Sequence, residues 1–323
     1  MSLFKLGLAA ALLGVAAASP VRAAPALEDP EATVVAELVV RPVVSGPAWW
    51  KVERGQSVVY VLGLPEEPLP KGLGWDQAVL KRRLAGADTL IAPVEPKAGL
   101  TDIPAFLRMR SRLKSHAPME QGLPEPLRAR FVAARTKLAR PPGRYNGWDP
   151  ILAGQILVND LQDSAHTTRR EPLGAIKALA RRLNVPVRPA ATFRVVGLLD
   201  PAVKNLTPQV SHACLAEALD EVELGAGALQ AAGAAWARGD VQGVLDGPRG
   251  FAACLLLLSG GADFWRRTMA EGADAVAASL QKSGHAVAVF QLRSLLARDG
   301  VLSRLKARGF EVTAEGRGVP AGS

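Results

Sequence analysis

The sequence is poor in aromatic residues, histidines and cysteines, and each shortage removes a class of interpretation. Aromatic residues make up 5% of the 323 residues, so the core must be filled mainly by Ala, Leu and Val. The four histidines are scattered without the paired spacing of zinc motifs, and we expect them to be satisfied locally or to face solvent. With 49% hydrophobic and 21% charged residues, the composition is typical of a globular protein and excludes a disordered one.

Long hydrophobic runs are also missing, except at the N-terminus. Beyond it, the longest apolar run covers residues 251–258, far short of the roughly 20 residues of a spanning helix, so we predict no transmembrane segment. Residues 1–23 combine Lys5, an apolar stretch over residues 6–18 and small residues up to Ala23. This pattern predicts a secretory signal peptide cleaved near Ala23, the alternative being a retained N-terminal anchor. The mature chain is then expected in an oxidising compartment, most simply a bacterial periplasm.

The two cysteines, Cys214 and Cys254, belong to no CxxC motif and no zinc-like cluster. In an exported chain such a pair more often forms a disulfide than two free thiols. A bridge closing a loop of about 40 residues would stabilise the fold by roughly 4 kcal/mol in the chain-entropy model. The alternative is two unpaired, buried small residues.

Positive charge is concentrated in one stretch of a chain whose formal net charge is +9. Residues 101–140 hold nine Lys or Arg against three acidic residues. Such a run is typical of solvated helix faces, but it can also contact an anionic membrane surface or an acidic partner. Nucleic acid is a poor partner for an exported protein, and the run lacks interleaved aromatic residues that would stack on bases. The candidate surface contacts are Arg108, Arg112, Arg128 and Arg135.

Hydrophobic periodicity predicts an α/β fold of the mixed α+β kind. Two strand-like runs joined by a polar turn predict a hairpin over residues 49–62, and short strands are expected at 89–94, 185–188, 286–290 and 310–313. Helical periodicity dominates between them. We therefore expect one domain over residues 46–315, with a central β-sheet built from N- and C-terminal segments and a large helical insert. Residues 24–45 are expected to form a poorly ordered leader, and residues 316–323 a disordered tail.

An ordered set of motifs resembles the TraB/GumN family, which is related to the Tiki metalloproteases. The matching stretches are residues 47–63 (PAWWKVERGQSVVYVLG), 69–75 (LPKGLGW), 87–90 (ADTL), 235–240 (AWARGD), 299–302 (DGVL) and 308–310 (RGF). Together they cover nearly the whole mature chain. The resemblance implies a site with two Gly-x-x-His motifs, each after a strand, and carboxylates from other strand ends. Imidazoles and carboxylates bind a divalent metal, which activates water at an open coordination position.

Every such position is replaced in this chain. The first motif begins at Gly63 but has Glu66 where the resemblance calls for His, and the second has Arg293, whose fixed cation repels a metal. The carboxylate positions are occupied by Pro93 and Ala191. We therefore expect no metal, no cofactor and no catalytic residue. The sequence then predicts a non-catalytic binding or interaction module of the cell envelope, whose partner it does not identify.

Two other functions remain open at this stage. Glu66, Glu67 and Glu95 can gather at strand ends near Arg293, either as an ion-pair cluster or as a hard-cation site of oxygen ligands. If the chain is an enzyme, it is a metal-dependent hydrolase with a site rebuilt around Glu66, Glu95 and Arg293. The third hypothesis is peripheral docking on an anionic membrane through the basic stretch. No nucleophile elbow, phosphate loop or dinucleotide fingerprint favours another enzyme class.

Overall fold

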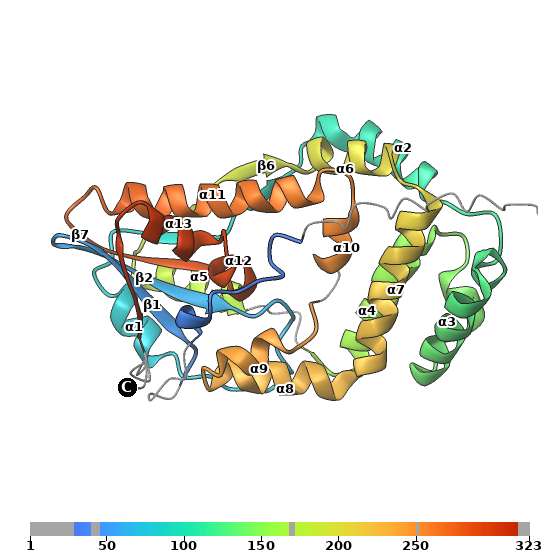
Figure 1. The fold of residues 1–323 in the computed structure, drawn as a ribbon, viewed down its shortest axis with the longest axis horizontal. Coiled ribbons are helices and arrows are strands. Elements are labelled where there is room, and N and C mark those ends of the chain that lie inside the picture. The colour runs from blue at the N-terminus through green and yellow to red at the C-terminus, as the bar shows by residue number, and fades with distance from the viewer. Residues whose placement is uncertain (1–28, 40–45, 168–171, 250–251, 316–323) are drawn as a thin grey trace, which may run out of the picture.

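A six-stranded mixed β-sheet forms one end of the protein, and helices form the other (Figure 1). The computed structural model describes residues 29–39, 46–167, 172–249 and 252–315. The strand order is β5-β3-β7-β2-β1-β8. These strands are β1 (Trp49–Arg54), β2 (Ser57–Leu64), β3 (Leu90–Ala92), β5 (Val187–Pro189), β7 (Gly284–Gln291) and β8 (Glu311–Glu315). The α/β class predicted from the sequence is confirmed, since N- and C-terminal segments alternate within one sheet.

The predicted hairpin is formed by β1 and β2, which pair antiparallel and turn at Gly55, whose φ of 60° favours glycine. Strand β8 pairs antiparallel with the outer side of β1, so the last strand of the chain lies beside the first. On the other side, β2, β7, β3 and β5 are all parallel. Their carboxyl ends therefore meet at the same edge of the sheet.

Helices cover both faces of the parallel strands. Helices α1 (Ala78–Leu84) and α5 (Pro172–Arg182) contact one another; α1 also contacts β7, and α5 contacts β3. Helices α11 (Gly261–Ser279) and α13 (Val301–Ala307) pack together, and α11 also packs against β7. Figure 1 shows the two pairs on opposite sides of the strands. Because β7 is covered on both faces, residues 286–290 form a continuous buried apolar run.

The helical insert lies between β3 and β7 and extends beyond the carboxyl ends of the strands (Figure 1). A second hydrophobic core, separate from that of the sheet, is built around Phe131, Tyr145, Leu157 and Leu215. The remaining helices are α2 (Ile103–Arg112), α3 (Glu125–Lys137), α4 (Pro150–Ser164), α6 (Val195–Lys204), α7 (Pro208–Leu224), α8 (Ala226–Ala237), α9 (Val241–Leu245), α10 (Ala252–Leu257) and α12 (Leu292–Leu296). None of the helices in the described ranges has the length and apolar character of a bilayer span.

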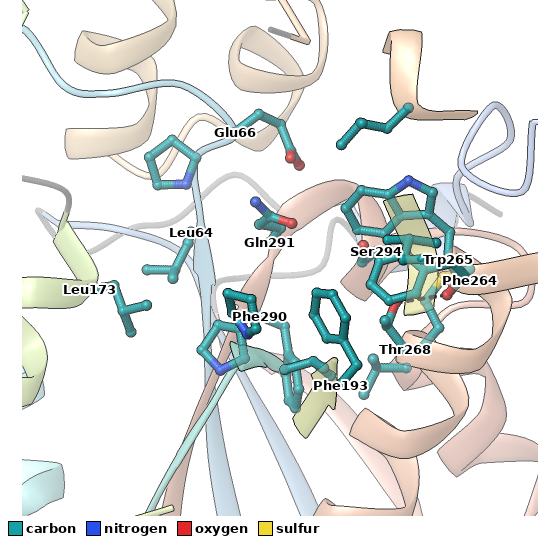
Figure 2. Close-up of a pocket in the computed structure, with 18 of the residues that line it drawn as sticks. Leu64, Glu66, Leu173, Phe193, Phe264, Trp265, Thr268, Phe290, Gln291 and Ser294 are labelled. Carbon is teal, nitrogen blue, oxygen red and sulfur yellow. Dashed lines mark hydrogen bonds between the residues drawn. The ribbon is translucent and has the colours of Figure 1, made fainter. Parts of the chain in front are cut away.

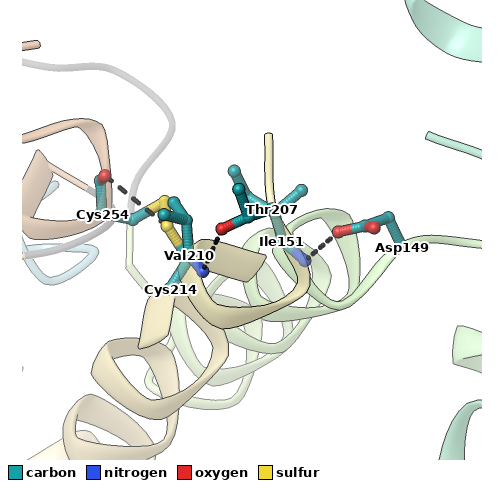
Figure 3. The surroundings of a disulfide bond; sticks show 6 residues. All are labelled: Asp149, Ile151, Thr207, Val210, Cys214 and Cys254. Atoms are coloured by element: carbon teal, nitrogen blue, oxygen red, sulfur yellow. Dashed lines mark hydrogen bonds between the residues drawn. A yellow bond between two sulfur atoms is a disulfide. The ribbon is translucent and has the colours of Figure 1, made fainter. Parts of the chain in front are cut away.

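The predicted disulfide is present and joins α7 to α10 through Cys214 and Cys254, with a Cα–Cα distance of 4.6 Å (Figure 3). Both cysteines are fully buried. Close by, the side chain of Asp149 accepts a hydrogen bond from the Ile151 N–H and so caps α4 (3.0 Å). Ile151 packs in one small buried cluster with the two cysteines. The bridge therefore ties α10 to the α4–α7 pair.

Within the stretch predicted as a poorly ordered leader (residues 24–45), the structure describes residues 29–39, which contact the main core. Leu38 is buried in the main core, and its carbonyl accepts a hydrogen bond from the Trp50 indole N–H (3.0 Å). Val34 forms an isolated bridge with Ala297. The apolar side chains of Leu38, Val34 and Val35 pack in or against the main core, although residues 29–39 show no alternation typical of a strand. The stretches predicted as a signal peptide (residues 1–23) and as a disordered tail (residues 316–323) lie outside the described residues.

Candidate functional site

The loops that follow the parallel strands meet at one edge of the sheet. Strands β2 and β7 end side by side, with Gly63 paired to Phe290 and Leu64 paired to Gln291. The chain then continues into residues 65–67 after β2 and into α12 after β7. Open α/β sheets bind ligands in this position, outside the carboxyl ends of their strands. The edge is therefore the first place to look for a site.

A cavity of about 600 Å³ opens at this edge, between the strand ends and helices α5, α6, α10 and α11. Its size lies within the range of small-molecule sites. The aromatic side chains Phe193, Phe264, Trp265 and Phe290 form much of its wall, and Figure 2 shows the Glu66 carboxyl directed toward the space that they border. Phe264 makes edge-to-face contacts with Phe193 at 4.6 Å between ring centroids. The cavity is thus a mainly apolar site with carboxyl groups at one side.

Glu66 is half-buried and has one direct polar contact among the described residues, from the backbone N–H of Arg293 (3.1 Å). Burial, followed by the nearby charge of Glu31, raises the pKa of Glu66 to about 8. The backbone hydrogen bond and the charges of Arg293 and Arg249 act in the opposite direction without cancelling this effect. Glu66 therefore keeps its proton at neutral pH.

An ion cluster lies beside Glu66 and includes two residues of the N-terminal segment, Asp29 and Glu31. Arg249 pairs with Asp29 and with the buried Glu31 (3.3 Å), and Glu31 also accepts a hydrogen bond from the Ser294 hydroxyl. Burial raises the pKa of Glu31. The Arg293 guanidinium donates to the backbone carbonyls of Leu245 and Gly247 (3.2 Å to Gly247). Neither guanidinium forms an ion pair with the Glu66 carboxyl among the described residues.

A second pair of carboxyl groups adjoins the cavity. Glu67 lines it and accepts a hydrogen bond from the Gln162 amide (2.7 Å). Behind it, the buried Glu221 of α7 has an oxygen without a hydrogen-bond partner in the described ranges. Burial and the charge of Glu67 raise the pKa of Glu221 to about 8, and burial raises that of Glu67 as well. Both carboxyls therefore take up a proton more readily than ordinary, exposed carboxyls do.

A sequence model of the TraB/PrgY/gumN family matches residues 48–314, which include the helical insert and all of the sheet except its last residue, Glu315. The chain belongs to the TraB/PrgY/gumN family. No curated protein and no solved structure gives a significant match. Any functional argument therefore rests on the family match and on the geometry of the site.

The structure places the two replaced TraB/GumN motifs next to each other. Gly63 and Phe290 begin the stretches that end in Glu66 and Arg293, and parallel register pairs them. Gly63 is retained for a steric reason, because a Cβ there would lie 2.4 Å from a Leu292 methyl carbon. The Gly63 carbonyl also accepts a hydrogen bond from the Trp236 indole (2.8 Å). Packing and this hydrogen bond therefore fix the backbone at the start of the first motif, regardless of which residue occupies its fourth position.

The other positions that the TraB/GumN resemblance assigns to ligands lie at the same edge. Pro93 follows β3 and lines the cavity, whereas Ala191 follows β5 and its carbonyl accepts a hydrogen bond from the Glu95 N–H (2.9 Å). Glu95 does not line the cavity, and its carboxylate pairs with Lys177. The described residues contain no group of three or more His, Cys, Asp or Glu side chains placed to hold a metal ion.

The four candidate basic residues divide between two helices. Arg128 and Arg135 lie on α3, where they pair with Glu125 and Glu120 respectively. Arg108 and Arg112 lie on α2 and are exposed, and their positive charges lower the pKa of the nearby Asp200, after the larger effect of its hydrogen bond to Lys204. Of these four residues, Arg108 and Arg112 are the two that form no ion pair with a described carboxylate.

Sequence patterns did not reveal the aromatic wall of the cavity. Phe193 lies in β6 (Thr192–Arg194), which pairs with β4 (Glu95–Lys97), and neither short strand was predicted. Trp265 and Phe264 lie in a stretch with helical periodicity, and no sequence motif marks them as site residues. The spacing of Phe264, Trp265 and Thr268 along α11 was the available signal, because residues three and four apart lie on one helix face.

Proposed function

We propose that this chain is an exported, non-catalytic TraB/PrgY/gumN protein that binds a small, largely apolar molecule of the cell envelope. The observation that carries the proposal is the aromatic-lined cavity of about 600 Å³ at the strand ends, where the family resemblance places a metal. Pro93 and Glu66 line that cavity in place of ligands, and Arg293 directs its guanidinium to backbone carbonyls. The site thus favours burial of apolar surface over activation of water.

Export is supported by two independent features of the chain. Residues 1–23 have the charged start, apolar stretch and small-residue end of a signal peptide. The Cys214–Cys254 bridge belongs to a class of bond that persists in oxidising compartments and is rare in the cytosol. A periplasmic location after cleavage near Ala23 accounts for both.

Ligand binding is tested with the neutral, apolar dye Nile red. We expect the purified mature protein to bind the dye with increased emission, and Thr268→Trp to weaken binding at least tenfold, since an indole at position 268 fills the cavity. The matched control is Ala278→Trp, whose position is exposed on the same helix and outside the wall of this cavity. Equal loss of binding in both variants, or unchanged binding in both, would exclude the cavity as the site.

A second function, docking on an anionic membrane surface, is favoured by the exposed face of α2. Leu100, Ile103 and Leu107 are three of the four large hydrophobic residues that are exposed in the described chain, and they lie together at and before this helix. Arg108 and Arg112 are exposed on the same helix. Exposed apolar side chains together with basic side chains on one helix are typical of interfacial membrane binding.

Vesicle sedimentation tests this second function. We expect binding to vesicles of 30% phosphatidylglycerol in phosphatidylcholine, and a loss of at least tenfold for Arg108→Glu/Arg112→Glu, since each basic residue near the surface contributes about 1 kcal/mol. Leu107→Asp should also weaken binding. Leu224→Asp is the matched control, because Leu224 and Leu107 are both 61% exposed and Leu224 lies on another helix. Binding that ignores the charge reversal would rule out α2 as the docking face.

A further inference from the structure

We infer that the ligand of the cavity is an organic cation, with an ammonium group held between the aromatic wall and the carboxyls of Glu66 and Glu67 and an apolar body in the remaining space. This inference rests on the proposed function and specifies the chemical class of its ligand. Among the described residues, the side chains lining the cavity include these two carboxyls and no Lys, Arg or His. An anionic ligand would therefore find no counter-charge on the wall.

The aromatic wall favours a cation over a neutral molecule of the same shape. Phe193, Phe264, Trp265 and Phe290 surround the space, and the negative faces of aromatic rings attract ammonium groups, most strongly in sites shielded from water. The Trp265 indole N–H is buried and has no hydrogen-bond partner among the described residues.

The two carboxyls that line the cavity, Glu66 and Glu67, contact no cationic side chain in the described ranges. Near Glu66, the three carboxyls of Asp29, Glu31 and Glu66 are accompanied by the two guanidinium groups of Arg249 and Arg293. Neither guanidinium group contacts the Glu66 carboxyl. On the side of Glu67, the neighbours are the carboxyl of Glu221 and the neutral Gln162. A bound ammonium group would therefore be a cation in direct contact with the Glu66 and Glu67 carboxyls, which the described side chains do not provide.

Binding of such a cation should release a proton. Without a ligand, Glu66 holds its proton up to a pH of about 8, because its charged form is buried and faces Glu31. A cation beside it favours the carboxylate, so the proton of the Glu66 carboxyl passes to solvent as the ligand binds. The affinity for a permanently charged ligand should therefore rise by about tenfold from pH 6 to pH 7, while that for a neutral ligand stays constant.

Two isosteric probes test the inference: benzyl(2-hydroxyethyl)dimethylammonium, and 3,3-dimethyl-4-phenylbutan-1-ol, in which carbon replaces the charged nitrogen. Both compete with Nile red for the mature protein at pH 8. We expect the cation to displace the dye at a concentration at least tenfold lower than the alcohol. Glu66→Gln should reduce this preference to less than threefold, whereas Glu95→Gln should preserve it, because Glu95 lies at the next strand end but outside the cavity wall.

The outcomes separate the ligand class from the proposed function. If the alcohol competes as well as the cation in the unmutated protein, the cation inference is wrong, although the cavity still binds apolar ligands. A preference that survives Glu66→Gln also overturns it, because the carboxyl would then play no part. If Nile red does not bind in the cavity at all, as judged with Thr268→Trp, both the inference and the proposed function fall.

Discussion

Replacing Cys214 with Ala is expected to lower the free energy of unfolding by about 4 kcal/mol, because the bridge to Cys254 closes a loop with a sequence separation of 40 residues. The loss comes mainly from the unfolded chain, which regains the conformations that the bridge removes. Urea denaturation of the oxidised protein and of the variant, followed by far-ultraviolet circular dichroism, measures the difference. A free energy of unfolding within 1 kcal/mol of the unmutated protein would contradict the prediction.

Double-variant analysis separates a bridge from two buried thiols. Because either single substitution opens the same loop, Cys214→Ala, Cys254→Ala and the double variant should lose nearly the same free energy. If the residues acted only as independent core side chains, the two losses would add. Adding a reductant to the unfolded, unmutated protein should reproduce the loss, and it should leave the double variant unchanged.

Substituting Glu66 with Gln is expected to stabilise the protein at pH 8.5 and to have little effect at pH 4. Folding raises the pKa of this carboxyl from an ordinary 4.5 to about 8, so the folded state holds a proton that the unfolded chain has released. Stability is therefore lost as the pH rises from about 4.5 to about 8, and it is level above that. Gln removes this loss, which is on the order of a few kcal/mol at most.

The measurement is a series of urea unfolding curves between pH 4 and pH 9. The gain of Glu66→Gln over the unmutated protein should grow through this window, since Gln accepts the Arg293 backbone hydrogen bond without the cost of a buried charge. Glu311→Gln, at an exposed position of β8, is the control and should change stability by less than about 0.5 kcal/mol at each pH. A variant less stable than the unmutated protein at pH 8.5 would show that the ionised carboxyl is a structural partner.

The sheet was predictable because its strands carry strong local signals. The hairpin around Gly55 has alternating residues and a polar turn, and residues 286–290 form a short apolar run typical of a buried strand. The disulfide between Cys214 and Cys254 was predicted from the expected export of the chain and from the absence of a metal-binding cysteine motif, rather than from the spacing of the two residues. Local pattern and global fold agree in these elements, which is why single-sequence reasoning found them.

The cavity could be predicted only in part. Glu66 and Pro93 were expected at strand ends, but the cavity that they share is also lined by residues of β4 and β6. Each of these strands has only three residues, which is too few to show a periodic pattern. Glu31 lies in a segment with no clear pattern, yet it is buried beside Ser294, more than 260 residues away in the sequence. Contacts over such separations are set by tertiary packing, and local propensity carries little information about them.

Metal content tests the central claim, that this edge of the sheet is a ligand cavity and has lost the metal chemistry implied by the family resemblance. The mature protein should be purified from the periplasm without chelators and without a metal-binding tag, then analysed by mass spectrometry for zinc, manganese and cobalt. We predict a folded protein with less than about 0.1 equivalents of each, because Glu66, Pro93, Ala191 and Arg293 occupy the ligand positions. Near-stoichiometric metal, removed by Glu66→Gln but not by Glu311→Gln, would contradict the account and point to a rebuilt hydrolase site.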